Sequence, residues 1–192
     1  TPSFTDLGLD SRLLKAINKL GYESPTPVQQ QAIPPIIDNR DCLVSAETGS
    51  GKTAAYLLPI LQQLLVSPTK ISGIKVLALC PTRELAQQIF GQCQLFCEFT
   101  DIKSGLITGG SDFKKQQLAL THHTDIIIAT PGRLLEHLQV STSYFQNLSV
   151  LILDEADRML NMGFSYDVLA IAELCNKQRQ TLLFSATLTH FG

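Results

Sequence analysis

What the sequence has little of already limits what this 192-residue chain can be. There is no basic excess: Lys plus Arg number 15 and Asp plus Glu 17, giving a formal net charge of −2. A broad positive surface for nucleic acid is therefore excluded, and any such site must be local. No apolar run reaches the roughly 18 residues needed to cross a bilayer, and residues 1–7 lack a signal-peptide pattern. We expect a soluble protein without a membrane partner, in the cytoplasm, or in the nucleus if the cell is eukaryotic.

A disulfide framework and a zinc site are also disfavoured. The five cysteines are odd in number, and two of them fall inside apolar runs that are expected to be buried. Cys93 and Cys97 share one face of an expected helix, but zinc needs about four ligands and no matching pair accompanies them. His122 and His123 lie in a polar turn without a nearby carboxylate or cysteine. We interpret the cysteines as small buried hydrophobic residues.

Short apolar runs alternate with stretches of helical period along the whole chain. The runs are rich in Val, Ile and Leu without polar alternation, as is typical of parallel strands covered on both faces. They comprise residues 42–46, 76–80, 105–108, 126–129, 150–153 and 181–184. Single apolar stripes follow the first two runs, at Leu57, Leu61 and Leu64 and at Leu85, Ile89, Cys93 and Phe96. The alternation predicts an α/β fold with three layers, α/β/α, and a mostly parallel sheet.

The segment before the first strand is expected to be helical. One helix, capped by Asp10, should end at Gly21, and a second should begin at Thr26 or at the proline after it. We assign residues 1–38 to this N-terminal annex, packed on the same domain, and residues 39–192 to the main domain. No repeat, low-complexity tract or long linker divides the chain further.

The most specific local motif follows the first apolar run and precedes an expected helix. It consists of Ala46, Glu47, Thr48, Gly49, Ser50, Gly51, Lys52 and Thr53. Glycines let backbone N–H groups curl around an anion, Lys52 can reach the outer phosphates, and the Thr53 hydroxyl can ligate Mg²⁺. The usual pattern begins with Gly where this chain has Ala46, but the strand–loop–helix context favours a phosphate-binding loop over an ordinary glycine-rich turn. The sequence predicts binding of ATP or GTP with Mg²⁺.

An acidic tetrad, residues 154–157, follows the fifth run. At a strand end one carboxylate can hold Mg²⁺ through water and its neighbour can orient or deprotonate the attacking water. Alone, the tetrad could equally be a solvated helix start, because carboxylates favour helix N-termini. Ligands of open α/β sheets bind outside the carboxyl ends of the strands, where the phosphate loop would also lie. We predict catalytic roles for Lys52, Asp154 and Glu155, and metal ligation by Thr53 and Asp154.

The loops after all six runs, taken in order, resemble the first of the two RecA-like domains of the DEAD-box RNA helicases. The resemblance covers essentially the whole chain. Residues 21–29 are similar to the adenine-reading Q motif of that family, with Phe4 as the companion aromatic residue. It implies a RecA-like P-loop fold in which Gln29 hydrogen-bonds adenine while Phe4 and Tyr22 pack near the base, so that ATP is the nucleotide.

The same resemblance implies contacts with single-stranded or duplex RNA. The segments concerned are Pro81, Thr82 and Arg83; Gly109 and Gly110; and Thr130, Pro131, Gly132 and Arg133. Hydroxyls, glycine N–H groups and arginines suit phosphate contacts, which carry no sequence information, so little base preference is expected. Read singly, each segment could be a strand-to-helix turn. Ser185 and Thr187 resemble a coupling motif that bonds toward Asp157, although such hydroxyls could also cap a helix.

The resemblance further implies a second RecA-like domain, absent from this chain, that supplies RNA contacts and arginine fingers worth about 10³–10⁵ in rate. We expect the chain to be the ATP-binding and partial RNA-binding domain of an ATP-dependent RNA helicase, nearly inactive alone. The alternative is an ATP-gated RNA clamp or scaffold with slow hydrolysis; a P-loop kinase or DNA-directed ATPase is disfavoured by the Q motif. The sequences of residues 54–59 and 153–164 are similar to those of bacterial family members.

Overall fold

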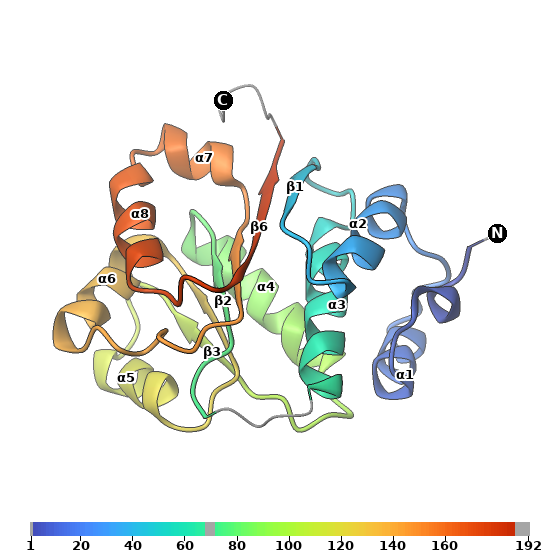
Figure 1. Ribbon diagram of the computed structural model, residues 1–192, viewed down its shortest axis with the longest axis horizontal. Coiled ribbons are helices and arrows are strands. Elements are labelled where there is room, and N and C mark those ends of the chain that lie inside the picture. The colour runs from blue at the N-terminus through green and yellow to red at the C-terminus, as the bar shows by residue number, and fades with distance from the viewer. Residues whose placement is uncertain (1, 68–71, 187–192) are drawn as a thin grey trace.

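The computed structural model describes residues 2–67 and 72–186, and a six-stranded sheet forms its centre (Figure 1). The strands are β1 Cys42–Ser45, β2 Val76–Leu79, β3 Ser104–Ile107, β4 Ile126–Ala129, β5 Val150–Leu153 and β6 Gln180–Ser185. They lie in the order β1-β6-β5-β2-β4-β3, and each neighbouring pair is parallel. The predicted parallel sheet is confirmed, and within the described residues it is entirely parallel.

Helices precede the sheet, and at least one helix lies between each strand and the next along the chain. Before β1 lie the 3-10 helix η1 Phe4–Leu7 and the helices α1 Ser11–Lys19 and α2 Pro27–Ile37. The later helices are α3 Lys52–Val66, α4 Arg83–Phe96, α5 Phe113–Thr121, α6 Pro131–Val140, α7 Ala156–Asn161 and α8 Ser165–Glu173. The side chains of Asp10 and Thr26 accept hydrogen bonds from the backbone N–H groups of Arg12 and Gln29. The two predicted helix starts are therefore confirmed as capped N-termini.

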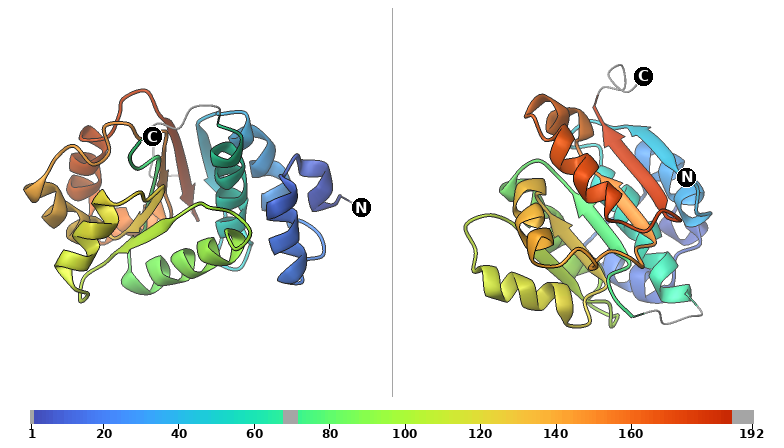
Figure 2. Two further views of the ribbon diagram at one scale, coloured as in Figure 1. Left: turned by 90° about the horizontal axis from the view of Figure 1, so that it is seen from below. Right: turned by 60° about the vertical axis from the view of Figure 1, so that its left-hand side comes forward.

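Two hydrophobic cores, one on each face of the sheet, give the three-layer architecture. Successive strand residues point to opposite faces. Accordingly Val76 and Ala78 of β2 join a core shared with η1 and α1–α4, whereas Leu77 and Leu79 join one shared with α5–α8. The strands pass between these two groups of helices (Figures 1 and 2). Because all four β2 residues are buried, the absence of polar alternation in the sequence is explained.

Strand β1 departs from the expectation that the strands are covered on both faces. It lies at the edge of the sheet and pairs with β6. Its residues alternate between half-buried and exposed, and Leu43 is 54% exposed. Cys42 and Val44 pack against the core of α1–α4, so one face of β1 is covered. The prediction of burial on both faces is wrong for this strand.

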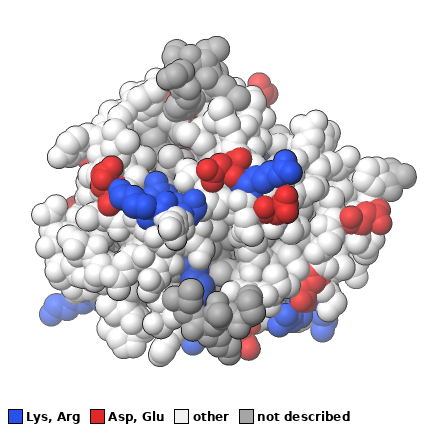
Figure 3. All heavy atoms as spheres, in the orientation of Figure 1, with Lys and Arg blue, Asp and Glu red and all other residues white. Residues whose placement is uncertain are grey.

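The charged side chains do not gather into one large field on the face seen in Figure 3. Basic and acidic residues lie there in small groups of both signs, and most of the surface between them is uncharged. This distribution agrees with the formal net charge of −2. In the part of the chain that the structure describes, we find no helix with the length and apolar character to cross a membrane.

Candidate nucleotide and RNA site

The loops after the strands meet at the carboxyl edge of the sheet, where two adjoining cavities lie. The first, of 470 Å³, is lined by residues of the annex, the phosphate loop and α4, together with Glu155. The second, of 490 Å³, lies beside it, since Thr48, Leu85, Gln88 and Glu155 line both. Thr82, Arg83, Glu84 and Arg158 complete the second. Both volumes fall within the range of about 300–1,000 Å³ that is typical of ligand pockets.

The phosphate loop divides into residues that face the first cavity and residues that hold the loop in place. Those lining the cavity are Thr48, Gly49, Gly51, Lys52 and Thr53. Ala46 instead belongs to the core, and its N–H donates to the carbonyl oxygen of Ser185, which extends the β1–β6 pairing. The hydroxyl of Ser50 donates to the carbonyl oxygen of Glu47 at 2.6 Å, closing the turn. Ala46 therefore occupies a core position, not a position on the wall of the cavity.

Gln29 fastens the annex to the phosphate loop. Its side chain is buried; Oε1 accepts from the N–H of Thr26 at 3.0 Å, and Nε2 donates to the carbonyl oxygen of Gly51 at 3.1 Å. Gly51 has φ of +81°, and a Cβ there would lie 2.6 Å from Gln29 Nε2. Only glycine combines this backbone conformation with so close an approach. Besides lining the cavity, Gln29 therefore links the N-terminal annex to the phosphate loop.

Two aromatic residues, Phe4 and Tyr22, also line the first cavity. Phe4 is buried, and its ring centroid lies 6.4 Å from that of Tyr22. The Tyr22 hydroxyl accepts a hydrogen bond from Gln92 Nε2 at 2.7 Å. Sequence reasoning missed Gln92 and its neighbour Gln88, which also lines the cavity. Their spacing from Leu85 places all three on one face of α4, a signal that could have identified them.

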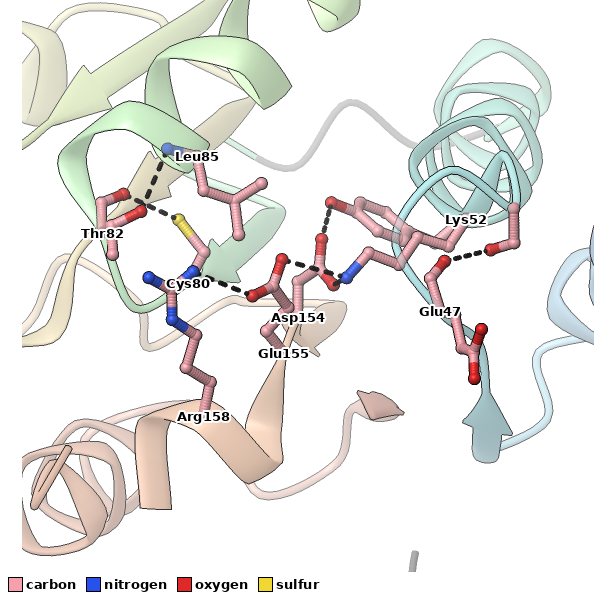
Figure 4. Close-up of polar contacts among 10 residues, drawn as sticks. Glu47, Lys52, Cys80, Thr82, Leu85, Asp154, Glu155 and Arg158 are labelled. Carbon is pink, nitrogen blue, oxygen red and sulfur yellow. Dashed lines mark hydrogen bonds and ion pairs between the residues drawn. The ribbon is translucent and has the colours of Figure 1, made fainter. Parts of the chain in front are cut away.

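Lys52 reaches across the cavity to the acidic motif (Figure 4). Its Nζ lies 2.9 Å from Asp154 Oδ1 and donates to Glu155 Oε2 at 3.2 Å. The Lys52 side chain is 8% exposed and that of Asp154 is fully buried, so this ion pair is shielded from solvent. Parallel strands bring residues 52 and 154 together although 102 positions separate them in the chain. The predicted catalytic residues are therefore adjacent.

Tyr56 supports Asp154 from behind. Its hydroxyl donates to Asp154 Oδ2 at 2.8 Å, and its ring packs edge-on against Phe184 with centroids 5.1 Å apart. Burial, and next the nearby charge of Asp154, raise the pKa of Tyr56 well above its ordinary value, so the hydroxyl remains a donor. Tyr56 was not predicted, because in the sequence it reads as one more residue of an apolar helix.

Glu155 stands between two cations. It adopts a left-handed backbone conformation, with φ of 52°. While Oε2 accepts from Lys52, Oε1 accepts from Arg158 Nη1 at 3.3 Å. Arg158, one turn along α7, approaches Glu155 from the other side (Figure 4). Both carboxylate oxygens of Glu155 are thus engaged by residues of the chain itself.

Asp154 has one oxygen suited to a hard cation. Its Oδ1 is buried and has no hydrogen-bond partner, although Lys52 lies nearby as an ion pair. Mg²⁺ is commonly held by one or two carboxylates together with substrate phosphates, not by an all-protein cage. Residues 2–67 and 72–186 contain no group of three or more His, Cys, Asp or Glu placed to bind a metal. Asp154, with Thr53 in the neighbouring cavity wall, fits such a Mg²⁺ site.

The predicted RNA segments lie along the same edge but differ in what they present. Thr82 caps α4 by accepting from the N–H of Leu85 at 3.2 Å, and the exposed Arg83 contacts the carbonyl oxygen of Gly109 at 3.5 Å. Gly109, Gly110 and Gly132 are exposed. Pro81 and Pro131 are buried and Thr130 is half-buried. The glycines and Arg83 are therefore open to a ligand, whereas the two prolines shape the turns from inside.

Arg133 and the coupling residues are placed differently. The side chain of Arg133 is 17% exposed and is bound within the chain. Ser185 is buried at the end of β6, and α7, which carries Asp157, packs against that strand. Thr187, the other predicted coupling residue, lies outside the described residues.

Comparison with known proteins agrees with this geometry. A family model described as DEAD/DEAH box helicase matches residues 26–191. The chain is 50% identical over 188 residues to "DEAD-box ATP-dependent RNA helicase 28" of Arabidopsis thaliana, covering 97% of this chain and 24% of that protein. It is 45% identical to "Probable ATP-dependent RNA helicase DDX27" of Homo sapiens, covering 97% of this chain and 25% of that protein.

A solved structure gives the same result. The crystal structure of a DEAD box protein from Methanococcus jannaschii superimposes with a TM-score of 0.91 at 38% identity, over 99% of this chain and 51% of that one. The curated relatives named above are eukaryotic, so the expected likeness to bacterial members is not supported. The chain spans about a quarter of the length of these relatives. On its sequence, its fold and the loops at its carboxyl edge, the chain belongs to the DEAD/DEAH box helicase family.

Proposed function

We propose that this chain is the ATP-binding and partial RNA-binding domain of an ATP-dependent RNA helicase, in which RNA stimulates ATP hydrolysis. The observation that carries the proposal is the buried contact of Lys52 with Asp154 and Glu155 beside a cavity of nucleotide size. Family membership and the names of the relatives support it. Because those relatives are eukaryotic, a nuclear location is proposed alongside a cytoplasmic one.

ATP binding must rearrange the Lys52 contacts. Phosphates in the cavity compete with Asp154 and Glu155 for the ammonium group, which lies 2.9 Å and 3.2 Å from their oxygens. Once Lys52 turns to phosphate, both carboxylates lose a cationic partner and become available for other tasks. Gln29, Phe4 and Tyr22 then contact the base, with the Gln29 amide suited to the donor–acceptor edge of adenine.

The acidic residues then take the roles predicted for them. Mg²⁺, when bound, neutralises charge that develops on the transferred phosphoryl group. Asp154 Oδ1, which pairs with Lys52 but has no hydrogen-bond partner, and the Thr53 hydroxyl would hold that ion, while Tyr56 fixes the other oxygen of Asp154. Glu155, released by Lys52, accepts a proton from the attacking water or orients it. For Glu155 Oε1 to contact that water, the bond from Arg158 must also break.

RNA would be held through its backbone by the exposed glycines and Arg83, and so with little base preference. A second RecA-like domain would supply further RNA contacts and arginine fingers, worth about 10³–10⁵ in rate. Without it, the 192-residue chain should bind ATP and hydrolyse it very slowly. Asp157, Ser185 and Thr187 are proposed to couple hydrolysis to RNA contact.

The test is RNA-stimulated ATP turnover by the full-length protein and its Glu155→Gln form. General acid–base catalysis contributes about 10²–10⁴ in rate, so the variant should lose at least that order of turnover while it still binds ATP. Glu173→Gln, on the exposed surface of α8, is the matched control and should behave as wild type. Equal turnover by wild type and Glu155→Gln would refute the assignment. Strand displacement measured beside RNA retention separates a helicase from a clamp, because a clamp retains RNA without displacing a strand.

A further inference from the structure

Behind the predicted RNA turns, a buried glutamine joins α5 to α6. Gln116 is 5% exposed, and its side-chain amide makes three hydrogen-bond contacts. Nε2 donates to the carbonyl oxygen of Thr108 at 2.6 Å, directly before the two exposed glycines. Oε1 accepts from Arg133 Nε at 2.9 Å and lies 2.9 Å from His137 Nε2. One side chain therefore contacts both turns.

The state of His137 follows from these contacts. The Oε1 atom of an amide can only accept, so His137 must donate from Nε2. The ring is fully buried and stacks on Phe113, with centroids 3.9 Å apart and an interplanar angle of 4°. Burial, and next the positive charge of Arg133, lower the pKa of His137. The imidazole is therefore neutral, and its Nε2–H group holds the side-chain amide of Gln116 in one orientation.

Arg133 completes the arrangement and has an internal partner for each of its three guanidinium nitrogens. Besides the bond from Nε to Gln116, Nη2 donates to the carbonyl oxygen of Ser111 at 2.7 Å and Nη1 to Glu136 at 2.9 Å. The guanidinium carbon also lies 5.0 Å from the centroid of the Phe113 ring. These bonds tie the loop before α5 to the first turn of α6.

We propose that Gln116 and Arg133 are positioning residues that hold the two RNA turns in register from behind, and that Arg133 makes no direct contact with phosphate. The inference rests on the RNA-binding function proposed above, and it changes the role that the family resemblance implies for Arg133. Phosphate contacts at this end of the edge then fall to Arg83 and to the backbone N–H groups of Gly109, Gly110 and Gly132, all of which are exposed residues.

Salt dependence separates the two roles. Each cationic phosphate contact on a single strand adds about 0.7 to the slope of log affinity against log salt concentration. A positioning residue releases no counterions, so its loss lowers RNA affinity by the same factor at every salt concentration and leaves the slope unchanged. A residue that touches phosphate lowers both the affinity and the slope.

The experiment measures RNA affinity of the full-length protein with a non-hydrolysable ATP analogue over a range of salt concentrations. Gln116→Leu and Arg133→Gln should each weaken binding by about tenfold, the loss expected from one charged hydrogen bond, with the wild-type slope. The double variant should be no weaker than the worse single variant, because either change breaks the same connection. Affinity for the ATP analogue, measured without RNA, should not change.

Arg133→Lys keeps the charge and guards against a variant that fails to fold. A lysine cannot bridge Gln116 and Ser111 at once, so it should bind RNA as weakly as Arg133→Gln. Arg83→Gln is the matched control for a direct contact and should lose about 0.7 from the slope. Wild-type RNA affinity in Arg133→Lys, or a slope loss of about 0.7 in Arg133→Gln, would overturn the inference. The proposed function would still stand in that case, because the wild-type protein binds RNA. A wild-type protein with no salt-dependent RNA binding would overturn both.

Discussion

Two regions of the carboxyl edge, the proposed nucleotide end around Lys52 and the proposed RNA end around Gln116 and Arg133, are stabilised by different interactions. At the nucleotide end the ammonium of Lys52 is buried between Asp154 and Glu155, in contacts that phosphate must displace. At the RNA end the amide of Gln116 and the guanidinium of Arg133 bind mostly to neutral groups and backbone carbonyls. Both partners of Lys52 are carboxylates that phosphate can replace, whereas only one of the three partners of Arg133, Glu136, is charged.

Under the proposed function, this difference lets one edge of the sheet combine contacts that ATP displaces with contacts that stay fixed. Buried charges interact strongly, so the exchange of one charged partner for another involves a large change in free energy. Hydrogen bonds from buried amides to backbone carbonyls fix a shape instead. We expect the nucleotide end to respond to ATP and the RNA end to be preformed. Substitutions at the two ends should therefore differ in how much they lower the unfolding free energy.

The largest effect is expected from Lys52→Met. It leaves the buried Asp154 and the neighbouring Glu155 without their shared cation. Removing one partner of a buried ion pair typically costs about 3–5 kcal/mol of unfolding free energy, and the Tyr56 hydroxyl offsets only part of that. Denaturant unfolding of the ligand-free 192-residue chain measures it. Lys177→Met, which breaks an exposed pair with Glu173 at the end of α8, is the control and should cost less than about 1 kcal/mol.

If Lys52→Met had the same unfolding free energy as the wild type, the contrast between the two ends of the edge would be contradicted. It would mean that the ion pair contributes as little as a surface pair, and that the nucleotide end does not depend on charge. ATP binding by the variant is expected to be lost in either case, so only the unfolding measurement bears on this point.

A smaller effect is expected from Gly51→Ala. The substitution places a Cβ 2.6 Å from Gln29 Nε2 and forces a non-glycine residue to φ of +81°. Left-handed strain alone costs about 1–2 kcal/mol, and displacement of the buried Gln29 amide adds the loss of its bond to the loop, about 1 kcal/mol. Gly49→Ala has φ of +86° but open space around the Cβ, so it reports strain alone. Equal unfolding free energies for the two variants would show that Gln29 does not fasten the loop.

Tyr56→Phe tests the support behind Asp154. The variant keeps the ring packed against Phe184 but leaves Asp154 Oδ2 buried without its donor. An unsatisfied buried acceptor costs about 1–3 kcal/mol, so the unfolding free energy should fall by about 2 kcal/mol. The Mg²⁺ concentration required for half-maximal ATP binding should also rise, because the carboxylate is no longer fixed. Unchanged stability and unchanged Mg²⁺ dependence would together contradict the positioning role.

Much of this organisation could be predicted from the sequence. The strands were predictable because buried parallel strands are continuous apolar runs, and the loops because the carboxyl ends of such strands share one edge. Strand β1 was predicted wrongly on one face, since edge position is a property of the assembled sheet. Leu43 has the same apolar character as the buried Leu77, and nothing local distinguishes the two.

The residues that sequence reasoning missed have partners in other helices, strands or loops. Tyr56 reads as core until Asp154 is placed beside it, and Gln116 carries no motif at all. For Arg133 the family resemblance implies a phosphate contact, which stays a prediction, whereas in the structure its guanidinium group is bound within the chain. Its bonds to Gln116 and Ser111 depend on how α5 packs beside α6, which no local pattern specifies. Side-chain direction and partner choice were therefore the parts that required the structure.

The smallest effect is expected at the RNA end, from Gly110→Ala. A Cβ on Gly110 would lie 2.6 Å from Arg83 Nη1, but that atom ends a flexible side chain which can move away. The cost is then the left-handed strain at φ of +84°, about 1–2 kcal/mol, without the added loss seen at Gly51. Gly109→Ala, with ordinary φ and open space, is the control and should leave stability unchanged. If Gly110→Ala proved as destabilising as Gly51→Ala, Arg83 would be held as rigidly as Gln29, and the RNA end would have a second fixed cation beside Arg133.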